Sequence, residues 1–233
     1  MIAPRPLCRA GAACAALALA GCGNDPARTG DLAVFAALGG QIAAQAGLRD
    51  DTPPAAAASP AELAAILPQL PPGPAIRFEL PSLGQSAIAF RIGDNADTVT
   101  LATVTGQSLT LRDGVIVATR GFVHDLMSTE LDGAAGRIAA RQPGPGRRAN
   151  RYLDGLDTEV TLPLDCALAS EGRETVTLDT GARVATTRMR ETCTSGALTL
   201  NNFYWVASDG TVVRARQWIS REVGELHFDL LRG

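Results

Sequence analysis

Few residues of this chain have side chains that commonly act in catalysis. The sequence holds two histidines and five cysteines, so a multi-histidine metal site is excluded. His124 lies beside Asp125 and near Ser128, but a catalytic triad needs separate elements around a cleft, and no nucleophile-elbow motif is present. His227 lies in a candidate terminal strand and is typical of a surface or hydrogen-bonded histidine. We therefore expect no catalytic residues, no metal and no cofactor.

One cysteine near the N-terminus suggests covalent lipid attachment. Two arginines precede an uncharged apolar stretch at residues 10–20, which is shorter than the roughly 20 residues that span a bilayer. The sequence Leu-Ala-Gly-Cys that ends at Cys22 matches the lipobox of bacterial lipoproteins. We expect residues 1–21 to be a signal peptide and Cys22 to carry the lipid; the alternative is an ordinary signal peptide with a chance cysteine. Gly23 favours a location at the periplasmic face of the outer membrane.

Two further cysteines are candidates for a disulfide. Cys166 and Cys193 remain once Cys8 and Cys14 leave with the signal peptide. In an oxidising compartment an even pair predicts a disulfide, and closing this loop of about 28 residues stabilises the fold by roughly 3.5 kcal/mol. A zinc or redox role is disfavoured because the chain has no Cys-x-x-Cys motif and no histidine near this pair.

Aromatic and arginine side chains gather in one candidate hairpin. If Asp209-Gly210 forms the centre of a two-residue turn, Val206 faces Val213 on one side of the sheet, and Asn201 faces Trp218 on the other. That other side then carries Phe203, Trp205, Arg214, Arg216 and Trp218. It is either a core face whose arginines lie over the rings or a glycan-binding surface, in which rings pack on sugars and arginines pair with acidic groups.

The composition excludes two broad classes. The chain is 46% hydrophobic and 19% charged, which is typical of a globular protein rather than a disordered one. Its net charge is −3, and it has no basic run that could neutralise the phosphates of a nucleic acid. Because loss of the signal peptide makes the chain more acidic, membrane attachment must come from lipid rather than from basic charge.

Helical patterns precede the candidate hairpin. Residues 31–48 carry apolar side chains at helical spacing, and residues 50–58 resemble a linker. Ser59 and Glu62 form a capping-box pattern that predicts a second short helix. We expect residues 22–74 to be a lipidated tether with one or two short helices.

From residue 75 onward the apolar residues alternate with a period of two. The expected strands are 75–80, 86–92, 98–104, 108–112, 115–119, 158–164, 173–178, 183–190, 197–207, 211–219 and 225–230. Asp113-Gly114 is a strong hairpin signal. Short turns predict an antiparallel meander, and a single β-rich domain over 75–233, strongly curled or barrel-like, avoids open edges. Residues 122–131 fit one helical turn, and residues 141–150 read as a flexible loop.

The chain resembles the YjbF/GfcB group of lipoproteins, which are associated with exopolysaccharide and group 4 capsule production. The resemblance rests on Cys22, on the strand-turn-strand segments 108–121 and 202–210, and on Arg216-Gln217-Trp218. It implies a β-rich periplasmic lipoprotein that assists polysaccharide secretion, with the polysaccharide or export proteins as partners and no catalytic residue set.

Three functions remain open from the sequence. The first is a non-enzymatic lipoprotein that assists capsular or exopolysaccharide production or export. The second is a polysaccharide-modifying enzyme, a hydrolase or lyase, which needs convergent carboxylates or a cleft of histidine, tyrosine and arginine. Arg120, His124 and Asp125 at the floor of a deep pocket would favour it. The third is a purely structural envelope lipoprotein with a protein partner alone.

Overall fold

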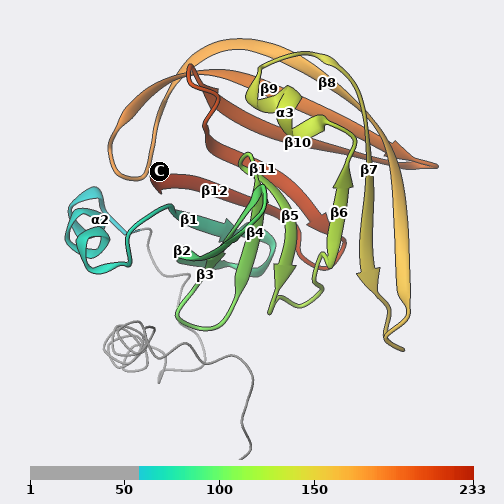
Figure 1. Cartoon of the computed structure of the whole chain (residues 1–233), viewed down its shortest axis with the longest axis horizontal. Helices are drawn as coiled ribbons and strands as arrows, with labels where there is room; N and C mark the ends of the chain where they lie inside the picture. Colours follow the sequence, from blue (N-terminus) through green and yellow to red (C-terminus); the bar gives the residue numbers. More distant parts are fainter. Residues whose placement is uncertain (1–57) are drawn as a thin grey trace, which may run out of the picture.

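The computed structural model describes residues 58–233, and the expected signal peptide, Cys22 and the helix at 31–48 lie outside the described residues. The described part contains two α-helices, two short 3-10 segments and twelve strands (Figure 1). The helices are α2 (Pro60–Ile66) and α3 (Ala134–Ala139), and the 3-10 segments are η2 (Leu67–Gln69) and η3 (Pro81–Leu83). The strands are β1 (Ala75–Leu80), β2 (Gln85–Asn95), β3 (Thr98–Ala102), β4 (Ser108–Arg112), β5 (Val115–Arg120), β6 (Ser128–Leu131), β7 (Gly144–Leu153), β8 (Glu159–Thr177), β9 (Arg183–Ser195), β10 (Leu198–Ala207), β11 (Val212–Ser220) and β12 (Gly224–Arg232).

All twelve strands belong to one antiparallel sheet. The order across the sheet is β5-β4-β3-β2-β1-β12-β11-β10-β9-β8-β7-β6. Strands that follow one another in the chain lie side by side in the sheet, with one exception: β5 and β6 lie at its two opposite edges. One further pair of neighbours, β1 and β12, joins the beginning and the end of this order. Because those two edges follow one another in the chain, the sheet curls into a nearly closed barrel, which confirms the expected meander.

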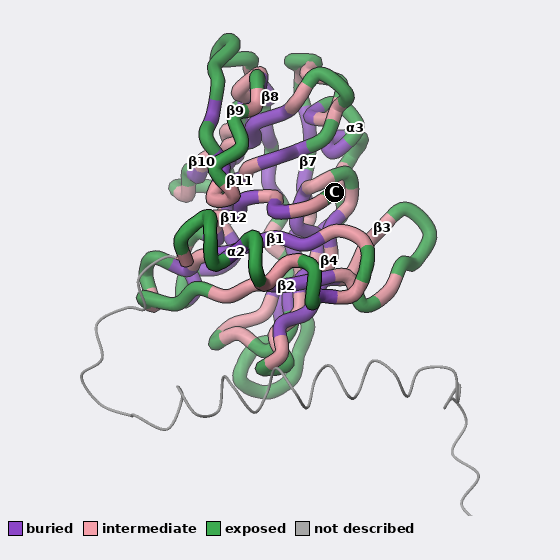
Figure 2. Tube along the Cα trace, turned by 90° about the vertical axis from the view of Figure 1, so that its left-hand side faces the viewer, coloured by how far each residue is buried: buried purple, intermediate pink, exposed green. Residues whose placement is uncertain are grey.

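The alternation of side chains along the strands fills the inside of the barrel. The principal core cluster includes Phe78, Met189 and Tyr204, each at most 1% exposed. Figure 2 shows buried backbone running through the centre of the sheet, with exposed residues in the turns and in the far ends of the hairpins. The interior is therefore a packed core, as expected for a period-two pattern with one apolar face.

A side chain from β11 satisfies the edge strand β5. The Gln217 amide nitrogen donates to the carbonyl of Ile116 at 2.7 Å, and the Ile116 backbone N–H donates to Oε1 of Gln217 at 3.0 Å. The glutamine thus replaces the neighbouring strand that an edge residue lacks. It fixes β5 against the inner face of β11.

The turn between β4 and β5 matches its sequence signal. Asp113 and Gly114 have φ of 48° and 79°, the two positive values that a type I′ turn requires. A Cβ added at Gly114 would lie 2.5 Å from Cβ of Val212. Glycine is therefore needed here both for its conformation and for the close approach of the turn to β11.

The turn between β10 and β11 differs from the expected one. Ala207 N–H donates to the carbonyl of Thr211 at 2.8 Å, so three residues form the loop, and Gly210 has φ of 94°. A register shift follows between Trp205 and Val206. The expected pairing of Val206 with Val213 is wrong, since Val206 pairs with Val212.

The same shift restores the register further along the hairpin. Phe203 pairs with Arg216, Tyr204 with Ala215, and Trp205 with Arg214, as the sequence predicts. The one-residue difference in the loop and the one-residue bulge cancel. The side of the sheet on which Phe203 and Trp205 lie was therefore predicted correctly.

The expected flexible loop at 141–150 is wrong, because β7 occupies most of it. Residues Gly144 to Leu153 of β7 pair with β8 over their whole length, whereas pairing with β6 begins only at Arg148. At Pro145, β7 therefore has a neighbouring strand on one side only. A proline, which lacks the backbone N–H, is tolerated at such an edge position. The segment 122–131 also differs: it contains β6 rather than a helical turn.

Strand β8 is continuous where the sequence predicts two strands. It runs for 19 residues with a register shift between Ser170 and Arg173. Beyond this bulge, β8 and the start of β9 form a hairpin arm, residues 173–187, which reaches across the outer face of the sheet (Figure 1). At its tip Asp179 pairs with Arg77 of β1 at 2.7 Å.

The predicted capping box at Ser59 is present. Ser59 caps α2 through Glu62, and Leu63 of this helix is fully buried against Phe90 and Leu231. The helix α3 was not predicted, since it is six residues long and begins after Gly133 without a side-chain cap. Among residues 58–233, no helix has the length and apolar character that crossing a membrane requires.

Candidate functional site

The aromatic and arginine side chains of the β10–β11 hairpin lie on the outer face of the sheet, as the register requires. The rings of Phe203 and Trp205 have centroids 6.5 Å apart. The guanidinium carbon of Arg188 lies 5.8 Å from the centroid of Phe203, and that of Arg216 lies 5.7 Å from Trp205. Both distances fall within the range of cation–π contacts. We call these four residues the outer aromatic face.

Trp205 is largely covered by the hairpin arm. Its side chain packs against Val176 and Leu178 of the arm, and the residue is only 6% exposed. Its indole nitrogen donates to Oε1 of Glu174 at 2.6 Å. Little of the ring is left for a sugar to stack on. This geometry favours the interpretation in which arginines extend over core rings.

Trp218 lies in a different environment from Trp205. It is half-buried and packs against the cluster that contains Leu200 and the two cysteines, as well as against the main core. Pairing between β10 and β11 covers Phe203 to Val206, so the expected pair of Asn201 with Trp218 is not formed. Instead, the Trp218 backbone N–H donates to the Asn202 side chain at 2.9 Å. The tertiary structure thus separates the two tryptophans.

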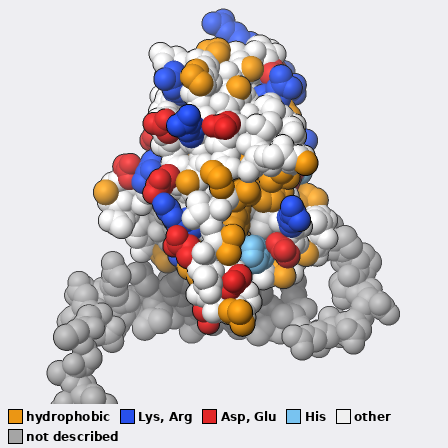
Figure 3. Space-filling view, turned by 90° about the vertical axis from the view of Figure 1, so that its right-hand side faces the viewer, with side chains coloured by type: hydrophobic (Ala, Val, Ile, Leu, Met, Phe, Trp, Pro, Cys, Tyr) orange, Lys and Arg blue, Asp and Glu red, His pale blue; other side chains and the backbone are white. Residues whose placement is uncertain are grey.

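Most arginines around the outer aromatic face are neutralised by carboxylates. Nη2 of Arg214 lies 2.6 Å from Asp229, and the hydrogen bond to that carboxylate raises the pKa of Arg214 more than burial lowers it. Arg188 and Arg190 share Glu171 at 2.7 and 3.1 Å. Arg216 has no carboxylate partner among residues 58–233. On the side of the molecule drawn in Figure 3, basic and acidic side chains likewise lie next to one another, beside a band of hydrophobic side chains.

The barrel interior holds an ion pair that the sequence did not reveal. Nε and Nη2 of Arg148 on β7 lie 2.8 and 2.7 Å from the two carboxylate oxygens of Glu191 on β9. The Tyr204 hydroxyl accepts from Arg148 at 2.7 Å, and the Asn202 amide donates to Glu191 at 2.8 Å. Both charged residues are at most 3% exposed. Such a bidentate, fully hydrogen-bonded pair compensates much of its own desolvation.

The ionisation of this cluster follows from its contacts. Burial alone would raise the pKa of Glu191, but the charge and hydrogen bonds of Arg148 outweigh it and hold that pKa below its ordinary value. Burial holds the pKa of Tyr204 well above its ordinary value. At the edge of the same core, burial raises the pKa of Tyr152 to about 12. The cluster is therefore an ionised pair flanked by neutral tyrosines near neutral pH.

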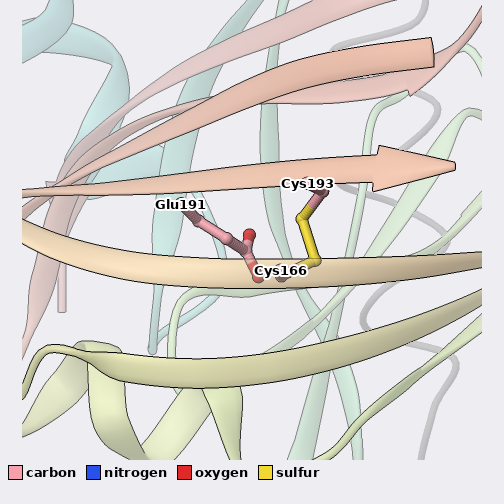
Figure 4. Close-up of side chains that lie close together, drawn as sticks. All are labelled: Cys166, Glu191 and Cys193. Atoms are coloured by element: carbon pink, nitrogen blue, oxygen red, sulfur yellow. A yellow bond between two sulfur atoms is a disulfide. The ribbon is translucent and has the colours of Figure 1, made fainter. Parts of the chain in front are cut away.

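The predicted disulfide is present beside the ion pair. Cys166 and Cys193 pair directly across β8 and β9 and are joined by a disulfide (Figure 4). Their sulfur atoms lie close enough to Glu191 for three ligands to share a metal ion. However, both sulfurs are in the disulfide, and the carboxylate already accepts hydrogen bonds from Arg148 and Asn202. The residues present do not fit a metal site.

The residues that a polysaccharide-modifying enzyme would need build a turn instead. Asp125 accepts hydrogen bonds from Thr119, Gly121 and Phe122, while Arg120 donates to backbone carbonyls. The ring of His124 stacks on Tyr152, with centroids 5.1 Å apart. These contacts shape the connection between the sheet edges β5 and β6.

The charges around four cavities of the described surface differ. The largest of the four, about 780 Å³, has both acidic and basic side chains on its wall, namely Glu130, Asp132, Asp165, Arg147 and Arg148. A second, about 250 Å³, lies among the ion pairs of Arg77 and Arg214. A third, about 380 Å³, is mainly apolar and lies at one mouth of the barrel.

The fourth cavity, about 570 Å³, lies at the base of the hairpin arm, beside the turn between β10 and β11. We call it the arginine groove, and it is lined by Arg141, Arg173, Thr175, Thr187, Val206 and Ser208 together with Glu174, Ala185 and Thr186. No sequence pattern predicts this groove. Arg173 reaches the groove through the bulge in β8, and Arg141 through the end of α3, and neither element was predicted.

Comparisons with known proteins agree with this fold. A family model described as group 4 capsule polysaccharide lipoprotein GfcB, YjbF, matches residues 33–231. The hypothetical lipoprotein YmcC from Escherichia coli has a similar structure, with a TM-score of 0.64 and 16% identity over 76% of this chain and 90% of that chain. At that identity the likeness shows the fold alone.

A putative exported protein with a YmcC-like fold from Bacteroides fragilis is 11% identical over 68% of this chain and 93% of that chain, with a TM-score of 0.32. No curated protein sequence matches the chain. Because the family model covers nearly the whole sequence, the chain belongs to the YjbF family of group 4 capsule polysaccharide lipoproteins.

Proposed function

We propose that this chain is a non-enzymatic, lipid-anchored protein that assists the production or export of a capsular polysaccharide or exopolysaccharide. It acts at the periplasmic face of the outer membrane and is attached through Cys22. Membership of a capsule lipoprotein family supports the process. The Leu-Ala-Gly-Cys sequence at Cys22 supports the anchor. The partner is the polymer, an export protein, or both.

The observation that carries the non-enzymatic part of the proposal is the use of the ionisable groups inside the barrel. Arg148, Glu191 and Tyr204 are buried and hydrogen-bonded to one another. A catalytic acid or base must reach its substrate, and these three residues are at most 3% exposed. The protein therefore acts by binding and positioning, through its outer surface.

On that surface, Arg216 is the one exposed member of the expected glycan-binding set, and Phe203 pairs with it across β10 and β11. Phe203 is half-buried, and Arg216 is exposed. Arg214 is held by Asp229, whereas Trp205 and Trp218 pack against apolar clusters. We assign Arg216 and Phe203 a supporting contact with the polymer and leave the other three a structural role.

A deletion strain tests the process. Loss of the gene should reduce the amount or the length of surface polysaccharide under conditions that induce it, and the intact gene supplied in trans should restore it. A deletion strain with unchanged polysaccharide would overturn the proposal.

Two cysteine variants test the anchor. Cys22→Ser should abolish incorporation of labelled palmitate and release the protein from the membrane fraction. Cys14→Ser changes a cysteine inside the expected signal peptide and should leave both unchanged. Equal labelling of the two variants would show that Cys22 is not the attachment point.

A further inference from the structure

We infer that the arginine groove binds an acidic sugar unit, one that carries a carboxylate such as a uronic acid. The inference rests on the proposed role in polysaccharide production and adds the chemistry and the place of polymer recognition. The volume of the groove, about 570 Å³, lies within the range of roughly 300–1,000 Å³ that is usual for ligand sites.

Neither cation of the groove forms an ion pair with a carboxylate among residues 58–233, although Asp209 lies near enough to Arg141 for their charges to interact. Arg173 is exposed, and its side chain has neither a hydrogen bond nor an ion pair within residues 58–233. Arg141 uses Nη1 to donate to the carbonyl of Ala207 at 2.6 Å, a contact that holds its side chain beside the turn of β10 and β11. Glu174, the one carboxylate on the wall, is engaged by Trp205 and Arg188. The groove therefore presents positive charge that an anion can satisfy.

Hydroxyl groups lie next to these cations. Thr175, Thr187 and Ser208 line the groove, and their side chains have no hydrogen-bond partner among the described residues. Serine and threonine hydroxyls donate and accept hydrogen bonds, which suits the hydroxyls of a sugar ring. The combination of guanidinium and hydroxyl groups distinguishes a sugar acid from a simple anion.

The backbone at Arg141 is a further sign of a specialised position. This residue has φ of 57°, a conformation that glycine or asparagine usually adopts after a helix. Arginine is strained there, and its side chain is nevertheless the one that lines the groove. The strain is understandable if the guanidinium is needed at this place.

The other cavities suit an anionic sugar less well. The largest of the four carries three acidic side chains, and its two arginines, Arg147 and Arg148, already pair with carboxylates. In the cavity beside Arg77 and Arg214, both of these arginines already hold carboxylates. Arg216 also lines it and has no carboxylate partner among residues 58–233, but three carboxylates share that wall. The groove is thus the cavity in which unpaired arginines and unpaired hydroxyls meet.

Calorimetric titration of the full chain, purified in detergent micelles, tests this assignment. The probes are galacturonic acid oligomers, glucose oligomers of the same length and inorganic phosphate. We expect the acidic oligomer to bind about tenfold more tightly than the neutral one, and phosphate not to displace it at equal concentration. Equal affinity for both oligomers, or full displacement by phosphate, would overturn the assignment.

Matched variants locate the site. Arg173→Gln should weaken binding of the acidic oligomer about tenfold. Arg183→Gln removes the same charge from the same arm but outside the groove, and should change the affinity less than about twofold. Thr187→Val removes one hydroxyl at nearly constant shape and should weaken binding about threefold. If Arg173→Gln and Arg183→Gln have equal effects, the site lies elsewhere.

The outcome is separable from that of the deletion strain. Loss of polysaccharide in the deletion strain, together with no binding to the groove, removes this inference and leaves the proposed function. Binding to the groove, together with unchanged polysaccharide in the deletion strain, removes the proposed function and leaves the groove as a binding site for acidic sugars.

Discussion

Arg148 and Arg173 lie on the neighbouring strands β7 and β8, yet their surroundings are opposite. Arg148 is 3% exposed and forms a bidentate pair with Glu191. Arg173 is exposed and lines a groove without a carboxylate partner of its own among the described residues. A buried guanidinium must be neutralised within the fold, whereas an exposed one can remain unpaired because water solvates it. The partner, rather than the residue type, decides which arginine maintains the fold and which can bind a ligand.

The outer aromatic face lies between these two extremes. Arg188 has both a carboxylate partner and an aromatic ring beneath it, whereas Arg216 has the ring alone. Partly exposed ion pairs contribute little to stability. The comparison therefore predicts a graded set of effects, from the ion pair of the core to the free arginines of the groove.

Breaking the buried ion pair should have the largest effect. Arg148→Ala leaves Glu191 charged and without its partner in the core, and should lower the free energy of unfolding by about 4 kcal/mol. Arg147→Ala, in the exposed pair with Asp165, is the matched control and should cost less than about 0.5 kcal/mol. Urea unfolding followed by tryptophan fluorescence measures both. Similar costs for the two variants would contradict the contrast.

Removing the disulfide beside this pair should come next. The double change Cys166→Ala and Cys193→Ala opens a loop with a sequence separation of 27 residues and should lower the free energy of unfolding by about 3.5 kcal/mol. Reduction of the disulfide in the unaltered protein should lower the urea midpoint about as far as the double change does. A midpoint that stays in place after reduction would mean that the sheet alone holds β8 to β9.

The closure of the barrel by Gln217 should be worth slightly less. Gln217→Leu leaves the buried N–H and carbonyl of Ile116 without partners and should cost about 3 kcal/mol. Gln69→Leu removes an exposed glutamine that donates to the carbonyl of Ala65 and should cost less than about 0.5 kcal/mol. Hydrogen exchange at Ile116 should become faster in the first variant only; unchanged exchange there would argue against the bridge.

Acid should weaken the same core through Glu191. Its pKa is lowered in the folded state, so its contribution is present above the ordinary carboxyl pKa and is lost as the pH falls through the lowered value. We expect the urea midpoint to decrease below about pH 4.5. The variant Glu191→Gln should start from lower stability and show a weaker dependence on pH; an equally steep dependence would assign the effect to other carboxyls.

Arg173 of the arginine groove and Arg216 of the outer aromatic face should show the smallest effects on stability. Arg173→Gln and Arg216→Gln remove arginines that have no carboxylate partner among the described residues, and each should change the free energy of unfolding by less than about 0.5 kcal/mol. Thermal unfolding measures this directly. A loss above about 2 kcal/mol for Arg173→Gln would place that residue with the structural arginines and remove the contrast with Arg148.

Much of the fold could be read from the sequence because its signals are local. Strands β1 and β4 have the expected bounds, Asp113-Gly114 forms the expected turn, and Ser59 caps α2 as its pattern indicates. Each of these features depends on a few neighbouring residues. The disulfide was also within reach, since few cysteines were left to pair.

The rest depended on contacts between distant residues. Strand β7 was missed because Pro145 and its glycines indicate a loop, and the pairing with β8 overrides that preference. The ion pair of Arg148 with Glu191 joins residues 43 positions apart. No local pattern could indicate it.

By itself, the sequence determined the meander of short strands, the side of the sheet on which Phe203 and Trp205 lie, and the family. Period-two alternation and turn-forming residues act over a few neighbouring positions, so both can be recognised from the local sequence. The tertiary structure alone decided that the hairpin arm covers Trp205, that Trp218 packs apart from it, and that Arg141 and Arg173 meet in one groove. Those outcomes follow from two one-residue bulges and from the curl of the sheet, which set long-range positions that no local pattern encodes.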